Sequence, residues 1–471
     1  MATSAYDRVN DKIDHGESCD EIVRNLASNV EKGEVPAGIF GNADVYAREL
    51  RKIFARCWVF LGHESEIPNP KDYVQRKIGE DSFILARDLD GSIRVLLNAC
   101  KHRGVQVCRA DSGSASRFIC PYHGWTYSLK GELVGAPLWS KALGDMPKAE
   151  NGLLKAAQVD SYRGLIFATL DASAPPLEEY LGGMKWYLDL IFGLDTAGME
   201  VLAPPQRVVL EANWKSGAEN FAGDDYHVGT LHRAAMEGGA FPVPFEENMN
   251  GYHIAASPGH SLSLSMASSV DEPGPKFFGF PEDIVAGFDR SGEREQLHGL
   301  AQRGRVMVAN VFPNFSIVVA PLTDDPSLPT TGMVSVRVWQ PMGPDKIELW
   351  NWFIGFKAMS DEQKERLYRV ALGSFSVGGL FEMDDTDPWI TIARNGMSVA
   401  AETLGMTLNY KMGLPGVGVA APVDDFPGPG RVVAPRFDEG VQRNLYSFYA
   451  AMMQAAPGEW PSLAFDGEAR S

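Results

Sequence analysis

Two short segments of this 471-residue chain each place one cysteine close to one histidine. The first supplies Cys100 and His102, and the second supplies Cys120 and His123. Thiolates and imidazoles are both metal ligands, and two such loops can close a four-ligand site. The intervening segment 103–119 is long enough for a β-hairpin to bring the loops together. The chain is therefore expected to fold around a metal centre.

Two kinds of metal centre use two cysteines and two histidines. In a Rieske [2Fe–2S] centre two histidines replace two cysteines on one of the irons. Structural zinc is the alternative, but zinc ribbons and fingers usually pair Cys with Cys and His with His. The mixed pairs favour the Rieske centre. Gly104 and Gly124, which follow the two histidines, would let the backbone bend closely around an inorganic core. A Rieske centre implies electron transfer.

A second set of candidate ligands follows about a hundred residues later. The segment 213–232 reads as a helix and contains Asp224, His227 and His232. Asp224 and His227, three residues apart, would share a face of that helix. His227 and His232, five apart, would point roughly 140° apart on a straight helix. Joint metal ligation therefore needs a break or a π-bulge, which Gly229 would permit.

Two imidazoles need one carboxylate to complete the facial triad of a non-haem Fe(II) site, which leaves positions open for O₂. The best candidates lie in the acidic segment 381–387, far downstream. Residue chemistry alone does not separate Asp384, Asp385 and Asp387. We choose Asp385.

The first 170 residues change from helical to β-rich texture. Apolar spacing predicts helices at 17–32 and 44–56. From 59 to about 170, short β-rich runs alternate with turn signals, and this stretch carries both Cys/His loops. The expected strands are 73–78, 82–86, 93–98, 118–119, 126–128 and 165–168. We expect an all-β module here.

Beyond residue 175 the pattern is mixed. The expected elements are a helix at 177–194, a strand at 208–210, a hairpin of 334–338 with 347–354, and a helix through Leu372 opened by a capping box of Ser360 with Gln363. The Pro- and Gly-rich segment 414–435 is expected to lack regular structure.

Composition excludes several classes of function. The formal net charge is −18, and no dense basic patch offsets it, so we expect no nucleic-acid binding. No apolar run approaches the roughly 18 residues of a membrane helix. The polar first twenty residues do not read as a signal peptide. Five cysteines are too few and odd in number for a disulfide framework. We expect a cytoplasmic protein that does not enter a membrane.

Together these motifs resemble the large (alpha) subunit of Rieske non-haem iron aromatic ring-hydroxylating dioxygenases. The likeness covers nearly the whole chain and rests on Cys-Lys-His-Arg-Gly, Cys-Pro-Tyr-His-Gly-Trp, Glu-Asn-Phe-Ala-Gly-Asp-Asp-Tyr-His-x₄-His and Phe-Glu-Met-Asp-Asp. It implies an α+β fold. An all-β Rieske [2Fe–2S] domain (40–160) would be inserted into a catalytic domain (1–39 and 161–471) with a large antiparallel sheet flanked by helices.

The resemblance also implies roles for particular residues. It selects Asp385 as the carboxylate ligand of a mononuclear Fe(II). It gives Asp224 a bridging role, hydrogen-bonded across a subunit interface to a Rieske histidine and an iron-ligating histidine. Asn220, Phe375 and Phe381 match positions near the iron or along the substrate pocket.

The implied function is a terminal oxygenase that uses O₂ to cis-dihydroxylate an aromatic ring. The expected substrate is an aromatic hydrocarbon, and polycyclic hydrocarbons are included. A ferredoxin and an NAD(P)H-dependent reductase would supply electrons. A small beta subunit would complete a hexamer of three alpha and three beta subunits.

Two alternatives stay open. An aromatic carboxylate such as phthalate, salicylate or benzoate could be the substrate and would need a cation in the pocket. Candidates for that cation are Arg233, Lys276, Arg303 and Arg305. The chain could instead be a Rieske electron carrier without oxygenase activity, but a pure carrier needs no second, open iron site.

Overall fold

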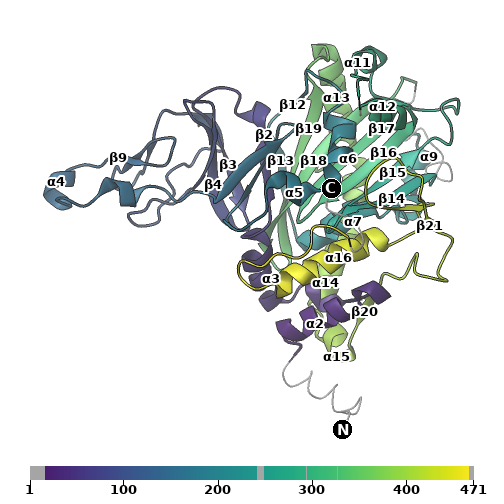
Figure 1. Cartoon of the computed structure of the whole chain (residues 1–471), viewed down its shortest axis with the longest axis horizontal. Helices are drawn as coiled ribbons and strands as arrows, with labels where there is room; N and C mark the ends of the chain where they lie inside the picture. The colour runs from purple at the N-terminus through teal and green to yellow at the C-terminus, as the bar shows by residue number, and fades with distance from the viewer. Residues whose placement is uncertain (1–15, 241–248, 293, 326, 466–471) are drawn as a thin grey trace, which may run out of the picture. The chain divides into compact units, whose positions relative to one another are not determined.

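The structure is a computed structural model that describes residues 16–240, 249–292, 294–325 and 327–465. The chain forms two compact units (Figure 1). The inserted unit is Phe54–Leu177, and the larger unit combines Met1–Ile53 with Glu178–Ser471. The domain boundaries expected at residues 40 and 160 stay a prediction.

The inserted unit is built from three small antiparallel sheets. Their strand orders are β10-β11-β2, β5-β4-β3-β6 and β7-β8-β9. The strands are β2 (Val59–His63), β3 (Asp72–Ile78), β4 (Asp81–Arg87), β5 (Ile93–Leu97), β6 (Ser112–Ser114), β7 (Phe118–Ile119), β8 (Thr126–Tyr127), β9 (Leu133–Gly135), β10 (Gln158–Tyr162) and β11 (Leu165–Thr169). Every strand that the sequence predicted here is present. The all-β character of this stretch is confirmed.

The larger unit is organised around one ten-stranded sheet. Its order is β12-β19-β18-β17-β16-β15-β14-β22-β21, and β13 also pairs with β19. All of these pairs are antiparallel. The strands are β12 (Met199–Val201), β13 (Gln206–Leu210), β14 (Gly251–Ser257), β15 (His260–Met266), β16 (Gly304–Val311), β17 (Phe315–Leu322), β18 (Thr331–Gly343), β19 (Lys346–Phe356), β21 (Ala421–Pro422) and β22 (Arg431–Ala434). The predicted hairpin is confirmed as β18 and β19.

Helices pack on this sheet and carry its functional side chains. Helix α7 (Trp214–Gly223) packs on β15 to β18, and α16 (Gly440–Gln454) packs on β14, β15 and α7. Figure 1 shows α16 in yellow beside α7. Helix α13 (Asp361–Phe375) packs on β17, β18 and β19, and α14 (Leu380–Gly396) packs on α13 and α7. The predicted α+β architecture, with helices flanking a large antiparallel sheet, is confirmed.

A buried polar cluster joins three of the helices. Glu49, at the end of α3 (Ala43–Glu49), accepts hydrogen bonds from Lys215 Nζ at 2.5 Å and Trp214 Nε1 at 2.8 Å in α7. Tyr449 in α16 donates its hydroxyl to the same carboxylate at 2.6 Å. Lys215 and Glu49 are both fully closed to solvent. This cluster connects α3 and α16 to the start of α7.

Most helix predictions hold at the level of position. The helix expected at 17–32 is α2 (Cys19–Asn29) with a 3₁₀ turn, and the Ser360 capping box opens α13 as predicted. The helix expected at 177–194 is two helices, α5 (Leu177–Leu181) and α6 (Met184–Phe192). The expectation that 414–435 lacks regular structure is wrong in part, because β21 and β22 lie there and extend the sheet edge.

Candidate functional site

The helix predicted over 213–232 is present as α7 up to Gly223 but is wrong beyond it, because the helix breaks there. Helix α7 ends there, and a short helix, α8 (Val228–Leu231), follows with His227 and His232 at its two ends. Gly223 has φ +137°, and a Cβ there would lie 3.1 Å from Val441 Cγ2 in α16. The break that joint ligation requires therefore exists at Gly223, whereas Gly229 lies inside α8. The two histidines flank one helical turn and their rings can converge.

Three ligand-type atoms meet at one buried point. His227 Nε2 lies 3.2 Å from His232 Nε2, and Asp385 Oδ1 lies 3.5 and 3.3 Å from these two nitrogens. Metal–ligand bonds of about 2.1 Å at angles of 90–110° place neighbouring ligand atoms roughly 3.0–3.4 Å apart. The triangle has the size that a single metal ion requires.

The chemistry of the three atoms also fits a cation. Asp385 comes from the second turn of α14 and is 4% exposed. Its Oδ1 is buried without a hydrogen-bond partner among the described residues. A carboxylate oxygen and two imidazole nitrogens facing one another would repel unless a proton or a metal lay between them. Two imidazoles and a carboxylate on one face match non-haem Fe(II) with open positions.

The structure separates the three aspartates that the sequence left as alternatives. Asp385 faces the Nε2 atoms of both histidines. Asp384 faces the other side of His232, with Oδ2 3.2 Å from Nδ1. Asp387 is exposed and is not part of the group.

Each histidine of the group has a carboxylate on its outer nitrogen. Asp224 Oδ2 lies 3.4 Å from His227 Nδ1, and Asp384 Oδ2 lies 3.2 Å from His232 Nδ1. Such carboxylates fix the ring orientation and leave Nε2 free for a metal. Burial alone would lower the pKa of His227, but Asp224 and the other nearby aspartates outweigh it and raise that pKa to about 9. Sequence reasoning named Asp384 only as an alternative ligand and missed its position on the outer nitrogen of His232.

Behind Asp224 lies a polar cavity of about 190 Å³. It is lined by Glu219, Asp225, Arg436 and His227 among others. Burial raises the pKa of Glu219 to about 8, although Tyr446 and Tyr410 donate hydrogen bonds to its carboxylate. Arg436 donates to Asp225 at 2.7 Å. Arg436 therefore compensates the charge of Asp225, whereas the partners of Glu219 are two tyrosine hydroxyls.

Two of the three predicted pocket residues, Phe375 and Phe381, lie beside His232. The rings of Phe375 and Phe381 stack at 5.1 Å, and Phe381 meets His232 edge-on at 5.2 Å. Asn220 lies in the last turn of α7, and its carbonyl accepts the backbone N–H of Asp224. The structure brings the two phenyl rings beside the histidine–carboxylate group and places Asn220 one helical turn before Asp224.

The two Cys/His loops of the inserted unit have matching backbone turns. Gly104 donates to the Cys100 carbonyl at 2.8 Å, and Gly124 donates to the Cys120 carbonyl at 3.0 Å. Both glycines adopt positive φ, +73° and +68°, as the predicted tight bends require. His102 Nδ1 and His123 Nδ1 approach to 3.1 Å.

The polarity of these loops fits a Rieske centre. Cys100 and Cys120 are 3% and 2% exposed and belong to the apolar core, whereas His102 and His123 are half-buried. Burial raises the pKa of the Cys100 thiol. Two inner thiols and two outer imidazoles are the donor set that holds the two irons of a Rieske [2Fe–2S] cluster.

Two aromatic residues support this arrangement and were not predicted. The Tyr127 hydroxyl lies 3.1 Å from Cys100 Sγ and accepts the backbone N–H of Lys101. Trp125 stacks on His102 with ring centroids 4.8 Å apart. Trp125 was visible in the Cys-Pro-Tyr-His-Gly-Trp motif, but Tyr127 had no local signal because its contact depends on the β7–β8 pairing.

Two known families match this chain. The family described as "Rieske [2Fe-2S] domain" matches residues 57–157, and "Ring hydroxylating alpha subunit (catalytic domain)" matches residues 177–455. The chain belongs to the ring-hydroxylating alpha-subunit family. As a member it carries a Rieske [2Fe–2S] cluster and a mononuclear iron, and it is an oxidoreductase of the ring-hydroxylating dioxygenase type.

Relatives of this alpha subunit match along nearly their full length. It is 35% identical over 454 residues to the N,N-dimethyl phenylurea N-demethylase subunit alpha of a Sphingobium species, covering 96% of this chain and 98% of the relative. It is 34% identical over 444 residues to a benzene 1,2-dioxygenase subunit alpha of Pseudomonas putida, covering 92% and 93%. The crystal structure of naphthalene 1,2-dioxygenase from Rhodococcus sp. bound to indole matches with TM-score 0.87 and 40% identity, covering 92% and 97%.

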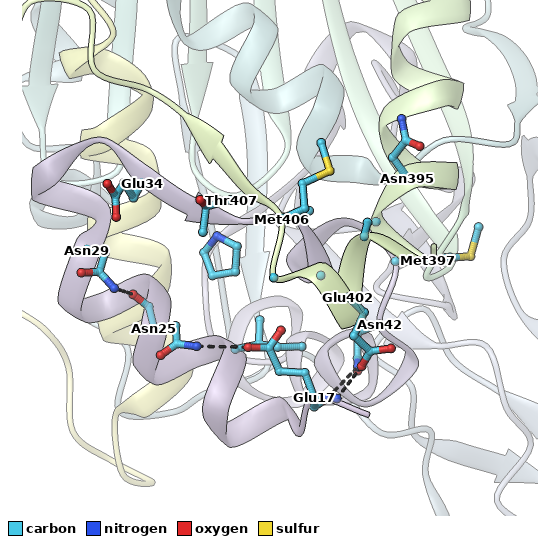
Figure 2. Close-up of a pocket in the computed structure, with 18 residues that line it drawn as sticks. Glu17, Asn25, Asn29, Glu34, Asn42, Asn395, Met397, Glu402, Met406 and Thr407 are labelled. Atoms are coloured by element: carbon cyan, nitrogen blue, oxygen red, sulfur yellow. Dashed lines mark hydrogen bonds between the residues drawn. The ribbon is translucent and has the colours of Figure 1, made fainter. Parts of the chain in front are cut away.

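The larger unit of this alpha subunit contains a further cavity. It measures about 430 Å³ and is lined by side chains such as Asn25, Glu34 and Glu402 (Figure 2). Figure 2 shows Glu17 among the lining side chains, where its carboxylate accepts a hydrogen bond from the Asn25 amide. None of the predicted site residues lines it. Within the described residues, no helix is long and apolar enough to cross a membrane.

Proposed function

We propose that this alpha subunit is the terminal oxygenase that converts an apolar aromatic hydrocarbon into a cis-dihydrodiol. The convergence of His227, His232 and Asp385 beside a stacked phenyl pair carries this proposal. An open iron site next to apolar walls suits a substrate without charge. The relatives named for benzene, biphenyl and naphthalene support the same class.

In this proposal each donor set has one metal group. Cys100, Cys120, His102 and His123 hold the [2Fe–2S] cluster. His227, His232 and Asp385 hold Fe(II). When bound, these groups supply the electrons and the O₂ activation of the reaction. The protein residues orient the imidazoles through Asp224 and Asp384 and keep the Asp385 carboxylate out of water.

The charges near the phenyl pair favour a hydrocarbon over an aromatic carboxylate. The guanidinium of Arg337 lies 5.3 Å from the Phe375 ring, but Glu382 neutralises it at 2.6 Å. Of the cations that the sequence offered, Arg305 pairs with Glu272, and Arg233 pairs with Glu237 on an exposed helix. A carboxylate substrate would need a cation without such a partner.

N-demethylation of an arylurea is the second candidate. Its support is the 35% identity with the N,N-dimethyl phenylurea N-demethylase subunit alpha. The same iron site and an apolar aryl pocket serve both reactions, so the substrate decides between them.

The proposed partners are a beta subunit in a hexamer of three alpha and three beta subunits, a ferredoxin and an NAD(P)H-dependent reductase. Asp224 is proposed to bridge a Rieske histidine of a neighbouring subunit and His227. Its side chain is 41% exposed and that of His227 is 20% exposed, so the carboxylate lies between the imidazole and the surface. A residue so placed can contact a second chain and His227 together.

A substrate panel tests the proposal. The alpha subunit is co-expressed with the beta subunit, ferredoxin and reductase of a relative and offered naphthalene, biphenyl, benzoate and an N,N-dimethyl phenylurea. We expect cis-dihydrodiols from the hydrocarbons, identified by mass spectrometry and loss of ultraviolet absorbance of the aromatic ring. An Asp385→Ala variant should make none. Turnover of benzoate alone would refute the hydrocarbon assignment, and formaldehyde release from the phenylurea alone would establish demethylation instead.

A further inference from the structure

The larger unit contains a buried ion pair outside the groups discussed as ligands. Arg337 lies on β18 inside the ten-stranded sheet, and Glu382 lies in the first turn of α14. Arg337 Nη1 donates to Glu382 Oε2 at 2.6 Å, and the two side chains are 0% and 3% exposed. A buried ion pair adds little net stability, because the cost of desolvating both charges offsets their attraction. The hydrogen bonds around the pair indicate a second role, in positioning neighbouring elements.

The pair belongs to a network that fixes both sides of the α13–α14 connection to the sheet. Arg337 Nη2 donates to Ser335 Oγ at 3.2 Å, and Ser335 donates to Asn351 Oδ1. Asn351 Nδ2 in turn donates to the carbonyl of Phe375, the last residue of α13. The sheet thus holds the end of α13 through a backbone carbonyl and the start of α14 through Glu382.

The start of α14 has no local side-chain cap. The connection 376–379 contains two glycines, and the N-cap Gly379 makes no side-chain capping bond. A helix start without a cap is prone to fray or rotate unless tertiary contacts hold it. Glu382 is the third residue of the helix, and its ion pair with Arg337 attaches the helix start to the sheet.

The position of Asp385 depends on the Arg337–Glu382 ion pair because of helix geometry. Residues three apart on a helix share a face, so Glu382 and Asp385 move together when the first turn rotates. Phe381, next to Glu382, packs against His232 at 5.2 Å. Metal ligands must be held within roughly 0.5 Å of their productive positions. A small rotation at Glu382 would therefore carry the Asp385 oxygen away from the imidazoles.

The charge of Arg337 also supports the position of Asp385. Burial raises the pKa of Glu382, Arg337 opposes this, and the nearby Asp385 carboxylate raises it further. Without Arg337, two carboxyl groups would lie one turn apart in a region closed to water, and they could not both stay ionised without repelling each other.

We propose that Arg337, acting through Glu382, is a positioning residue that holds Asp385 against His227 and His232. This inference rests on the proposed function, because it requires Asp385 to be an iron ligand. It makes Arg337, 48 positions upstream of Asp385 in the sequence (385 − 337), a determinant of iron binding without being a ligand.

Iron affinity of the purified alpha–beta complex tests the inference. Fe(II) binding at the mononuclear site is measured by competition with a chelator, and the Rieske cluster is measured separately by its reduced EPR signal. We expect Glu382→Gln and Arg337→Gln to weaken Fe(II) binding about 10- to 100-fold, as loss of a supporting partner does at other metal sites. Arg337→Lys keeps the charge but not the two-way fork and should fall between wild type and Arg337→Gln. The Rieske signal should not change.

Glu49→Gln is the matched control, because it removes one partner of an equally buried ion pair in the same unit. It should lower the unfolding temperature and leave Fe(II) affinity unchanged. Equal weakening by Glu49→Gln and Glu382→Gln would show a general loss of stability and overturn the inference, as would an unchanged affinity in both Glu382→Gln and Arg337→Gln. Asp385→Ala separates the two levels: if this variant keeps wild-type affinity, the proposed iron site itself is wrong. If Glu382→Gln does not fold, Arg337→Lys alone decides.

Discussion

Asp384→Asn probes the outer carboxylate of His232 without touching a proposed ligand. Asp384 Oδ2 lies 3.2 Å from His232 Nδ1, and the side chain is 33% exposed. Two full unit charges at that distance attract by about 1.3 kcal/mol in water and about 5 kcal/mol at an effective dielectric constant of 20. The imidazole bound to a metal carries only part of a charge and the site is partly solvated. The attraction energy therefore lies towards the lower of these two values. We expect a loss of about 1.4–2.7 kcal/mol, or 10- to 100-fold in Fe(II) affinity.

The assay is chelator competition for Fe(II), with the Rieske EPR signal as an internal reference. Asp387→Asn is the matched control, since Asp387 lies on the same helix and outside the histidine–carboxylate group. It removes the same charge three residues away and should change Fe(II) affinity less than twofold. Equal losses in Asp384→Asn and Asp387→Asn would mean that net charge, and not the orientation of His232, sets the affinity, and the reasoning would be refuted.

Three further predictions address the units around these centres. Gly223→Ala should destabilise the larger unit by about 1–3 kcal/mol in chemical denaturation, because alanine disfavours φ +137° and its Cβ would crowd Val441; unchanged stability would contradict the proposed cause of the helix break. His260 accepts the Phe312 N–H on Nδ1 and donates Nε2–H to the Tyr180 carbonyl, and burial lowers its pKa to about 4. Its folded pKa is below the unfolded value of about 6.5, so its contribution is present above pH 6.5 and is lost as pH falls towards 4; stability should fall by about 2 kcal/mol between pH 7 and pH 5, and that loss should be absent in His260→Gln. Tyr127→Phe removes the hydroxyl 3.1 Å from Cys100 Sγ and should lower the cluster's reduction potential in a redox titration, since hydrogen bonds to the sulfurs favour the reduced state; an unchanged or higher potential would exclude that hydrogen bond in the holoprotein.

Local sequence was sufficient wherever function is written in short motifs. The Cys/His loops, their glycine bends and six strands of the inserted unit were visible from spacing and turn chemistry, whereas β2, β6, β9 and β10 were not predicted. Helix continuity was not visible either. Gly223 and Gly229 are equally able to break a helix, and the choice falls on Gly223 because Val441, from a helix more than 200 positions downstream, packs against it. Arg337 was invisible for the same reason, since its importance arises from a contact between β18 and Glu382 of α14.

The consecutive aspartates show how tertiary structure completes an ambiguous motif. Neighbouring residues on a helix point about 100° apart, so they cannot both approach one atom, but they can approach one ring from two sides. Asp385 Oδ1 lies 3.3 Å from Nε2 of His232, and Asp384 Oδ2 lies 3.2 Å from its Nδ1. One carboxylate completes the histidine–carboxylate group while the other fixes the imidazole that it shares. A rotation of α14 by one residue would exchange their partners. The contact of Arg337 with Glu382, which opposes such a rotation, is therefore as important for the site as the identity of the two aspartates.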